Sequence, residues 1–162
     1  MLRSITVLLA GGILASLAVA GTLSGPAPSF TLESRDGEAV TLADLQGEVV
    51  RIKFWATWCG PCRQEMPHLE ALHQRYGSLG FTLLGVNVED NRDGADKFLR
   101  DTPVTFPVLF DPKNEVSKLY DVVAMPSTVL VARDGTMRFI HHGYKPGYEN
   151  EYQAQIRALL RE

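Results

Sequence analysis

The two cysteines at positions 59 and 62 constrain this chain more than any other feature. The run Trp58-Cys59-Gly60-Pro61-Cys62 follows residues 48–55, a mostly apolar stretch typical of a buried β-strand. Pro61 suits the first turn of a helix, because the amide N–H that proline lacks would have no partner there. At this spacing Cys59 and Cys62 face the same side of that helix, so their sulfur atoms can reach bonding distance without unwinding it.

A helix N-terminus is also a setting in which a thiol becomes reactive. Only the thiolate attacks a disulfide, and unpaired amide groups with the helix dipole lower a thiol pKa from its free value of about 8.5. We expect Cys59 to be exposed and to attack, and Cys62 to lie shielded one turn inside and to resolve the mixed disulfide. A bridge over so short a loop stabilises a fold little, which favours a reversible redox role. His68 and His73 do not give metal-ligand spacing with the pair, so we expect no metal site.

The first twenty residues differ in composition from the rest of the chain. Arg3 is their only charge, and residues 5–20 form an uncharged, mostly apolar run that ends in Ala18-Val19-Ala20. This pattern predicts that residues 1–20 are a secretory signal peptide cleaved after Ala20; an uncleaved membrane anchor through residues 5–20 is the alternative. We read residues 21–28 as a linker and residues 29–162 as one domain. The expected location is the periplasm or an equivalent exported compartment, which is oxidising.

Composition excludes several other classes of protein. The chain has 162 residues, 45% of them hydrophobic and 22% charged, and a formal net charge of −3 at pH 7. These values are ordinary for a single globular domain. The sequence has no run of lysine and arginine long enough to bind phosphates, so we expect no nucleic-acid partner. We expect a monomer.

Predicted strands and helices alternate along the chain. Asp36-Gly37 lies between two short strands and favours a β-hairpin. The region around Tyr144, Tyr148 and Tyr152 suggests no chemistry, and we expect it at the surface. The predicted strands span residues 30–33, 39–42, 48–55, 81–88, 106–110, 127–132 and 136–142, and the predicted helices span residues 59–76, 93–100, 115–120 and 149–160. This order predicts an α/β sandwich with helices on both faces of one sheet.

The cysteine segment also resembles a known family. Residues 54–67 read Phe-Trp-Ala-Thr-Trp-Cys-Gly-Pro-Cys-Arg-Gln-Glu-Met-Pro and resemble the active-site segment of the TlpA/ResA-like family of exported thioredoxin-like proteins. Residues 25–32 and 84–88 are similar to that family's N-terminal segment and next strand. The resemblance implies a thioredoxin-like three-layer sandwich, with a central mixed β-sheet, an N-terminal β-hairpin and a helix–strand insertion at about residues 90–112.

The resemblance also implies an activity and partners. Such proteins reduce protein disulfides in an oxidising compartment, often in cytochrome c maturation. It implies protein disulfide substrates, apocytochrome c among the candidates, and a membrane thiol electron donor of the DsbD/CcdA kind. No cofactor is implied beyond the redox-active Cys59-Cys62 disulfide.

Several positions match the family's substrate-contacting residues. Met125-Pro126 resembles the cis-proline that thioredoxin-like folds place beside the two cysteines. Pro126 would leave the backbone of Met125 free to pair with an extended substrate segment. We expect Trp58, together with Gly60 and Pro61, to contact the partner and Trp58 to shield the pair; core packing of Trp58 is the alternative.

Two charged residues near the pair are candidates for tuning its thiols. Glu65 matches the acidic residue of the family's CxxCxxExP pattern and faces the same side of the helix as Cys62. A partly buried carboxylate there would raise the thiol pKa values and relay protons. Lys53 departs from the pattern, because thioredoxin has a buried aspartate there and the exported family commonly has a neutral residue. Our hypothesis is that Lys53 pairs with Glu65 or stabilises the Cys62 thiolate; otherwise its stem carries the charge to solvent. We expect Pro67 to kink the helix.

Two alternative functions use the same cysteines. A thiol peroxidase of the peroxiredoxin type shares the fold, but its pattern places threonine three residues before the reactive cysteine, where this chain has Ala56. A copper-binding metallochaperone would hold Cu(I) through the soft thiolates. No methionine or histidine stands at a convincing spacing to complete such a site. We therefore favour a disulfide reductase over both.

Overall fold

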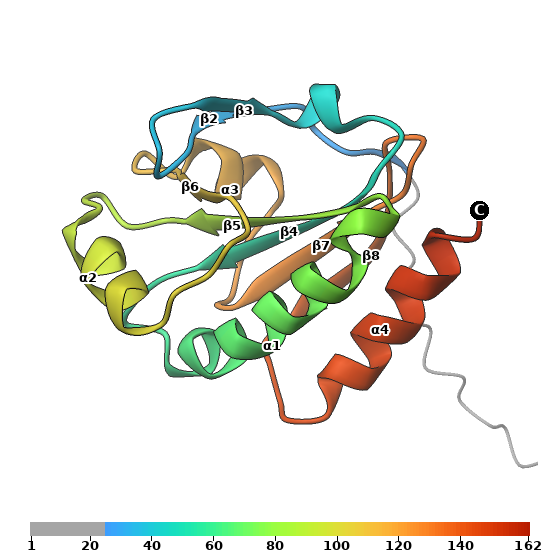
Figure 1. Ribbon diagram of the computed structural model, residues 1–162. Helices are drawn as coiled ribbons and strands as arrows, with labels where there is room; N and C mark the ends of the chain where they lie inside the picture. The colour runs from blue at the N-terminus through green and yellow to red at the C-terminus, as the bar shows by residue number, and fades with distance from the viewer. Residues whose placement is uncertain (1–24) are drawn as a thin grey trace, which may run out of the picture.

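A mixed six-stranded β-sheet forms the centre of the protein (Figure 1). The computed structural model describes residues 25–162, so the predicted signal peptide or anchor and residues 21–24 of the predicted linker lie outside it. The strand order is β1-β8-β7-β4-β5-β6. The bounds are β1 Gly25–Pro26, β4 Val49–Trp55, β5 Phe81–Asn87, β6 Val108–Phe110, β7 Ser127–Val131 and β8 Thr136–His142.

The central strand β4 is buried along its whole length. It pairs in parallel with β5, from Val49 opposite Phe81 to Trp55 opposite Asn87, and antiparallel with β7 on its other edge. Because successive side chains of a strand point to opposite faces, β4 contributes two different rows. Val49, Arg51, Lys53 and Trp55 point to one face, and Val50, Ile52 and Phe54 point to the other.

Helices cover both faces of the sheet, as the sequence predicted. The helices α1 (Gly60–Tyr76), α2 (Asp93–Asp101) and α4 (Tyr148–Leu159) bury apolar side chains against one face. The short helix α3 (Glu115–Leu119) and the hairpin of β2 (Thr31–Glu33) and β3 (Ala39–Thr41) cover the other (Figure 1). Two 3₁₀ helices, η1 (Leu42–Leu45) and η2 (Gly77–Leu79), complete the elements of the described chain. The predicted three-layer thioredoxin-like architecture is confirmed.

The predicted insertion is present, and it widens the sheet. The helix α2 is followed by β6, which pairs in parallel with β5 from Val108 opposite Gly85. A single antiparallel bridge between Ser34 and Leu109 joins the hairpin to this edge. Within residues 25–162, no helix combines the length and the apolarity needed to cross a bilayer.

The predicted linker extends too far into the fold. Gly25 and Pro26 form β1 and pair antiparallel with Met137 and Thr136 of β8. The Ala27 N–H then donates to the Gly135 carbonyl at 2.9 Å. These backbone pairs hold residues 25–27 to the sheet edge, so the ordered fold begins before residue 29.

The helix α1 carries the predicted cysteine segment at its start. It continues from Gly60 to Tyr76 with Pro67 inside it, so Pro67 does not end the helix. After η2, Gly80 adopts the left-handed conformation with φ of 88° and turns the chain into β5. Such a φ favours glycine, which has no Cβ to clash. The crossover from β4 through α1 to β5 thus places the cysteines at the carboxyl end of the central strand.

Candidate active site

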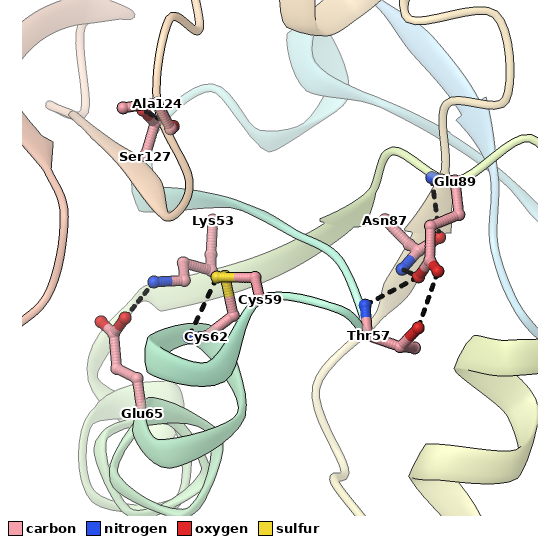
Figure 2. Close-up of a disulfide and its surroundings, with 9 residues drawn as sticks. All are labelled: Lys53, Thr57, Cys59, Cys62, Glu65, Asn87, Glu89, Ala124 and Ser127. Carbon is pink, nitrogen blue, oxygen red and sulfur yellow. Dashed lines mark hydrogen bonds and ion pairs between the residues drawn. A yellow bond between two sulfur atoms is a disulfide. The ribbon is translucent and has the colours of Figure 1, made fainter.

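The two cysteines form a disulfide at the N-terminus of α1 (Figure 2). Cys59 is the N-cap residue, and its sulfur accepts a hydrogen bond from the Cys62 N–H at 3.2 Å. Cys62 has no exposed surface, whereas Cys59 is 4% exposed. Cys59 is therefore the more accessible sulfur, as predicted, but the prediction of an openly exposed Cys59 is wrong for the disulfide form. The N–H that Cys59 already accepts would stabilise negative charge on its sulfur after reduction.

A carboxylate holds the loop that leads into the helix. Glu89, just past the end of β5, accepts hydrogen bonds from the Thr57 N–H at 2.8 Å and the Thr57 hydroxyl at 2.7 Å. It also accepts one from the Asn87 amide at 3.0 Å (Figure 2). Burial alone would raise the pKa of Glu89, but these hydrogen bonds outweigh it and lower the pKa. These contacts were not predicted, because no sequence pattern indicates that a residue after β5 reaches the loop before Cys59.

The segment before β7 lies at the same end of the sheet as Cys59. The Met125-Pro126 peptide bond is cis, which confirms the prediction. Ser127 pairs with Phe54, near the end of β4, so the cis-proline lies beside the loop that leads to the disulfide. Ser127 donates its hydroxyl hydrogen to the Ala124 carbonyl at 2.7 Å and thereby closes this turn (Figure 2).

The backbone of Met125 is free at this turn. The Pro126 carbonyl accepts the Gly143 N–H at 2.7 Å. Among residues 25–162, neither the N–H nor the carbonyl of Met125 forms a hydrogen bond. Its side chain packs against the apolar clusters on both faces of the sheet. An extended segment of another chain could therefore pair with Met125 through its backbone.

Apolar side chains project around this end of the molecule. Trp58 is 68% exposed, which rules out the alternative that it packs in the core, whereas Trp55 is fully buried. Gly60 and Pro61 are exposed between the cysteines. Val123, two residues before Met125, is 74% exposed. The predicted substrate-contacting residues are thus accessible, except that Pro126 itself is buried.

Three charged side chains are buried beneath α1. Lys53 donates to one carboxylate oxygen of Glu65 (Figure 2), and Arg51 donates to the other at 2.9 Å. The three side chains are at most 1% exposed. The predicted pairing of Lys53 with Glu65 is confirmed, and the alternative that Lys53 reaches solvent is wrong. Glu65 is also more deeply buried than the partly buried carboxylate that we expected.

The sequence analysis missed Arg51. Its guanidinium carbon lies 3.8 Å from the centre of the Tyr152 ring, which is contributed by α4. Tyr152 is 1% exposed, so its predicted surface position is wrong. The signal was present in the period of β4, because a residue two positions from Lys53 in a buried strand must share its face.

Burial dominates the electrostatics of this cluster. It lowers the pKa of Lys53 to about 8, although the negative charge of Glu65 opposes that shift, and the positive charge of Arg51 adds to it. Burial also lowers the pKa of Arg51, against the attraction of Glu65. The pKa of Tyr152 is raised to about 12, mainly by burial and then by Glu65.

Comparison with known proteins places this arrangement in a family. Residues 23–140 match the model of the AhpC/TSA family. The chain is 36% identical to the thiol-disulfide oxidoreductase ResA of Bacillus subtilis over 109 residues, which cover 67% of this chain and 61% of that protein. It is 35% identical to the thioredoxin-like protein YneN of Bacillus subtilis over 136 residues, 80% of this chain and 77% of that one. The match to ResA thus spans about three-fifths of that relative's length.

Solved structures agree with this assignment. The crystal structure of a Chlorobium tepidum protein, provisionally described as the thiol:disulfide interchange protein DsbE, superposes with a TM-score of 0.82 and 39% identity. The match covers 85% of this chain and 96% of that one. This chain therefore belongs to the AhpC/TSA family, among thioredoxin-like relatives that are named thiol-disulfide oxidoreductases.

Proposed function

We propose that this protein is an exported disulfide reductase that exchanges dithiol for disulfide through Cys59 and Cys62. The observation that carries the proposal is the disulfide at the N-terminus of α1, with Cys59 as the N-cap and Cys62 sealed behind it. A thiolate at Cys59 would receive the Cys62 N–H and the positive end of the helix dipole. The names of the relatives support the same chemistry.

The reaction follows from the two environments. In the reduced protein, the Cys59 thiolate attacks one sulfur of the substrate disulfide, forms a mixed disulfide and releases the other substrate sulfur as a thiolate. Cys62 then loses its proton and attacks the Cys59 sulfur. The Cys59-Cys62 disulfide forms, and the second substrate thiolate leaves. Two electrons pass from the protein to the substrate, and a thiol donor must supply them for the next cycle.

The substrate is a protein segment held in an extended conformation. The free N–H and carbonyl of Met125 offer main-chain pairing that does not depend on the substrate's sequence. Trp58, Gly60 and Pro61 add an exposed surface next to the attacking sulfur. This combination suits the reduction of disulfides in unfolded or flexible chains.

The setting of the reaction follows from the N-terminal signal and the family resemblance. We propose that the protein acts as a monomer in the periplasm or an equivalent compartment, either free or anchored through residues 5–20. Apocytochrome c is the substrate that the resemblance favours, and a membrane thiol carrier of the DsbD/CcdA kind is the donor. The cysteine pair is the only redox group that this cycle needs, so we propose no metal, no other cofactor and no nucleic-acid partner.

The equilibrium reduction potential of the Cys59/Cys62 pair tests the direction of the reaction. The full chain is equilibrated with ratios of reduced to oxidised dithiothreitol, and the two forms are separated after thiol alkylation. A potential near that of thioredoxin, about −270 mV, supports a reductase. A potential near −120 mV, that of a strong oxidant, would reverse the assigned direction. Cys59→Ser serves as the control, because it cannot form the pair.

A further inference from the structure

The charged cluster beneath α1 is too costly to be a packing device. Arg51, Lys53 and Glu65 are at most 1% exposed, and two cations share one anion. Removing ions from water is expensive even when they are paired, and apolar side chains of similar volume often serve stability equally well. Glu65 follows Cys62 by three residues on α1, and Arg51 and Lys53 reach it from the face of β4 that α1 covers.

Glu65 is poorly placed to accept the proton of Cys62. Each of its two carboxylate oxygens already accepts a hydrogen bond from a buried cation, one from Arg51 and one from Lys53. A proton arriving at Glu65 would have to displace one of these charge-assisted bonds and leave a cation without its partner. The arginine cannot yield, since guanidinium stays protonated in proteins. Of the three groups, only Lys53 can change its charge without breaking the Arg51–Glu65 pair.

We propose that Lys53, and not Glu65, exchanges the proton with Cys62, and that Arg51 is the positioning residue that holds the Glu65 side chain in place while Lys53 does so. This inference rests on the proposed function. The ammonium of Lys53 reaches Glu65, three residues after Cys62 on α1, so it lies within a helical turn of the resolving sulfur. A separation of up to one turn, roughly 5.4 Å, suits proton transfer through one bridging water. Figure 2 shows the Lys53 side chain extending from β4 toward Glu65.

The two strands next to β4 place no titratable side chain directly opposite Lys53. Gly85, its partner on β5, has no side chain, and Thr128, its partner on β7, does not titrate. The titratable and charged groups around the cluster are Arg51 of β4, Glu65 and the reduced Cys62 of α1, Tyr152 of α4, His141 of β8 against the Tyr152 ring, and Tyr144 in the loop before α4. Two of these oppose each other directly, because Arg51 lowers the pKa of Lys53 and Glu65 raises it.

The cluster contains an acceptor for the proton that Cys62 loses. The neutral amine of Lys53 takes the proton from the Cys62 thiol and becomes an ammonium, which remains paired with Glu65. The Cys62 thiolate attacks the Cys59 sulfur, the mixed disulfide breaks, and the substrate thiolate leaves with the electron pair. The ammonium later releases its proton to solvent or to the departing thiolate. Burial lowers the pKa of Lys53 to about 8, toward the range in which thiols titrate, and this favours proton exchange between the two groups.

A two-phase reaction separates this proposal from the proposed function. Reduced full-length protein is mixed with 5,5′-dithiobis(2-nitrobenzoate), and the release of thionitrobenzoate is followed by stopped flow. The first phase reports attack by Cys59, and the second reports resolution by Cys62. Absence of the first phase would defeat the proposed function. Only the rate and pH profile of the second phase bear on Lys53.

Four variants distinguish the roles of Lys53, Glu65 and Arg51 in the second phase. Lys53→Met slows it roughly a hundred-fold near pH 8 and moves its inflection to higher pH, because Cys62 must then ionise unaided. Glu65→Gln keeps a fast second phase and moves the inflection to lower pH, since Lys53 loses its anion. Arg51→Met moves the inflection to higher pH, since Lys53 becomes the only cation left to hold Glu65, and Arg51→Lys restores it.

Two further variants control for the loss of a surface charge and for misfolding of Lys53→Met. Lys118→Met, at an exposed lysine of α3, leaves both phases unchanged. Lys53→Gln, which retains a hydrogen-bond donor for Glu65, gives the same slow second phase if Lys53→Met does not fold. The proposal is overturned if Lys53→Gln resolves the mixed disulfide at the wild-type rate, or if Glu65→Gln is the variant that loses the second phase.

Discussion

The two faces of strand β4 share one backbone but bury opposite kinds of side chain. Toward the hairpin and α3, Val50, Ile52 and Phe54 pack among apolar residues, where burial contributes about 25 cal/mol per Å² of apolar surface. Toward α1, Arg51 and Lys53 are buried as deeply, although each buried ion costs several kcal/mol before its partner offsets it. One face of the strand therefore supplies stability, and the other gives up stability to place charge beneath a reactive sulfur.

Removing the shared anion should disturb this arrangement most. Glu65→Ala leaves Arg51 and Lys53 as two adjacent buried cations without a partner. We expect the free energy of unfolding of the oxidised protein to fall by about 3–5 kcal/mol, measured by urea denaturation. A loss below about 1 kcal/mol would mean that solvent reaches the cluster and that the two faces do not differ as described.

Replacing all three charged residues by apolar ones tests whether the cluster is needed for stability. A variant that combines Arg51→Met, Lys53→Met and Glu65→Leu makes the α1 face as apolar as the other. We expect it to recover stability to within about 1 kcal/mol of wild type or to exceed it. In this variant the attack of Cys62 on the mixed disulfide should be as slow as in Lys53→Met. A triple variant that is as unstable as Glu65→Ala would show that the cluster is needed for folding itself.

Alkaline pH should reduce the free energy that the burial of the charged Lys53 side chain costs. In the oxidised protein, Lys53 has a pKa of about 8, against 10.5 in an unfolded chain. Between these values the unfolded chain binds the extra proton, so stability rises with pH; below pH 8 the full cost is present. Relative to Lys53→Met, the wild type should gain roughly 2–3 kcal/mol over this window, measured by denaturation at each pH. A parallel pH dependence of the two proteins would contradict the lowered pKa.

The hydrogen bonds from Thr57 to Glu89 should stabilise the loop that carries Cys59. Glu89→Ala removes the acceptor of both the N–H and the hydroxyl of Thr57. We expect a loss of about 1–2 kcal/mol in stability and a slower first phase with the aromatic disulfide. The matched control is Asp90→Ala, at the exposed neighbouring position, which removes the same charge without these bonds. Equal effects in both variants would assign the change to charge alone.

The apolar face should show the smallest and simplest effect. Ile52→Val removes one methylene group from a fully buried site between Arg51 and Lys53 in the sequence. We expect a loss of about 1 kcal/mol in stability, with no change in reduction potential or in the pH profile of either thiol phase. A shifted profile would show that the two faces are coupled through the strand.

Most of the fold could be predicted because its signals are local. The apolar run of β4, Pro61 in the first turn of α1 and the alternation of strands and helices each follow from nearby residues. The strand β1 was missed because it is two residues long and gains its pairing only from β8, which is distant in the sequence. A pattern search over one segment contains no information about that partner.

The candidate site divides in the same way. Cys59, Cys62 and the cis bond at Pro126 were predictable from motifs, and the cost of burying an ammonium suggested the pairing of Lys53 with Glu65 as a hypothesis. The contact of Arg51 with Tyr152 and the bond from Thr57 to Glu89 depend on how α4 and β5 pack in three dimensions. Such long-range contacts are set by the tertiary fold and not by spacing along the chain.

The pairing of β1 with β8 determines at which end of the sheet the described chain begins. Gly25 lies opposite Met137, near the start of β8, whereas His142 at the other end of β8 lies opposite Ser127, next to the cis-proline. The chain therefore enters the sheet at the end remote from the redox pair. A tether or tag on the amino-terminal side would therefore join the described domain at the end of the sheet opposite the disulfide.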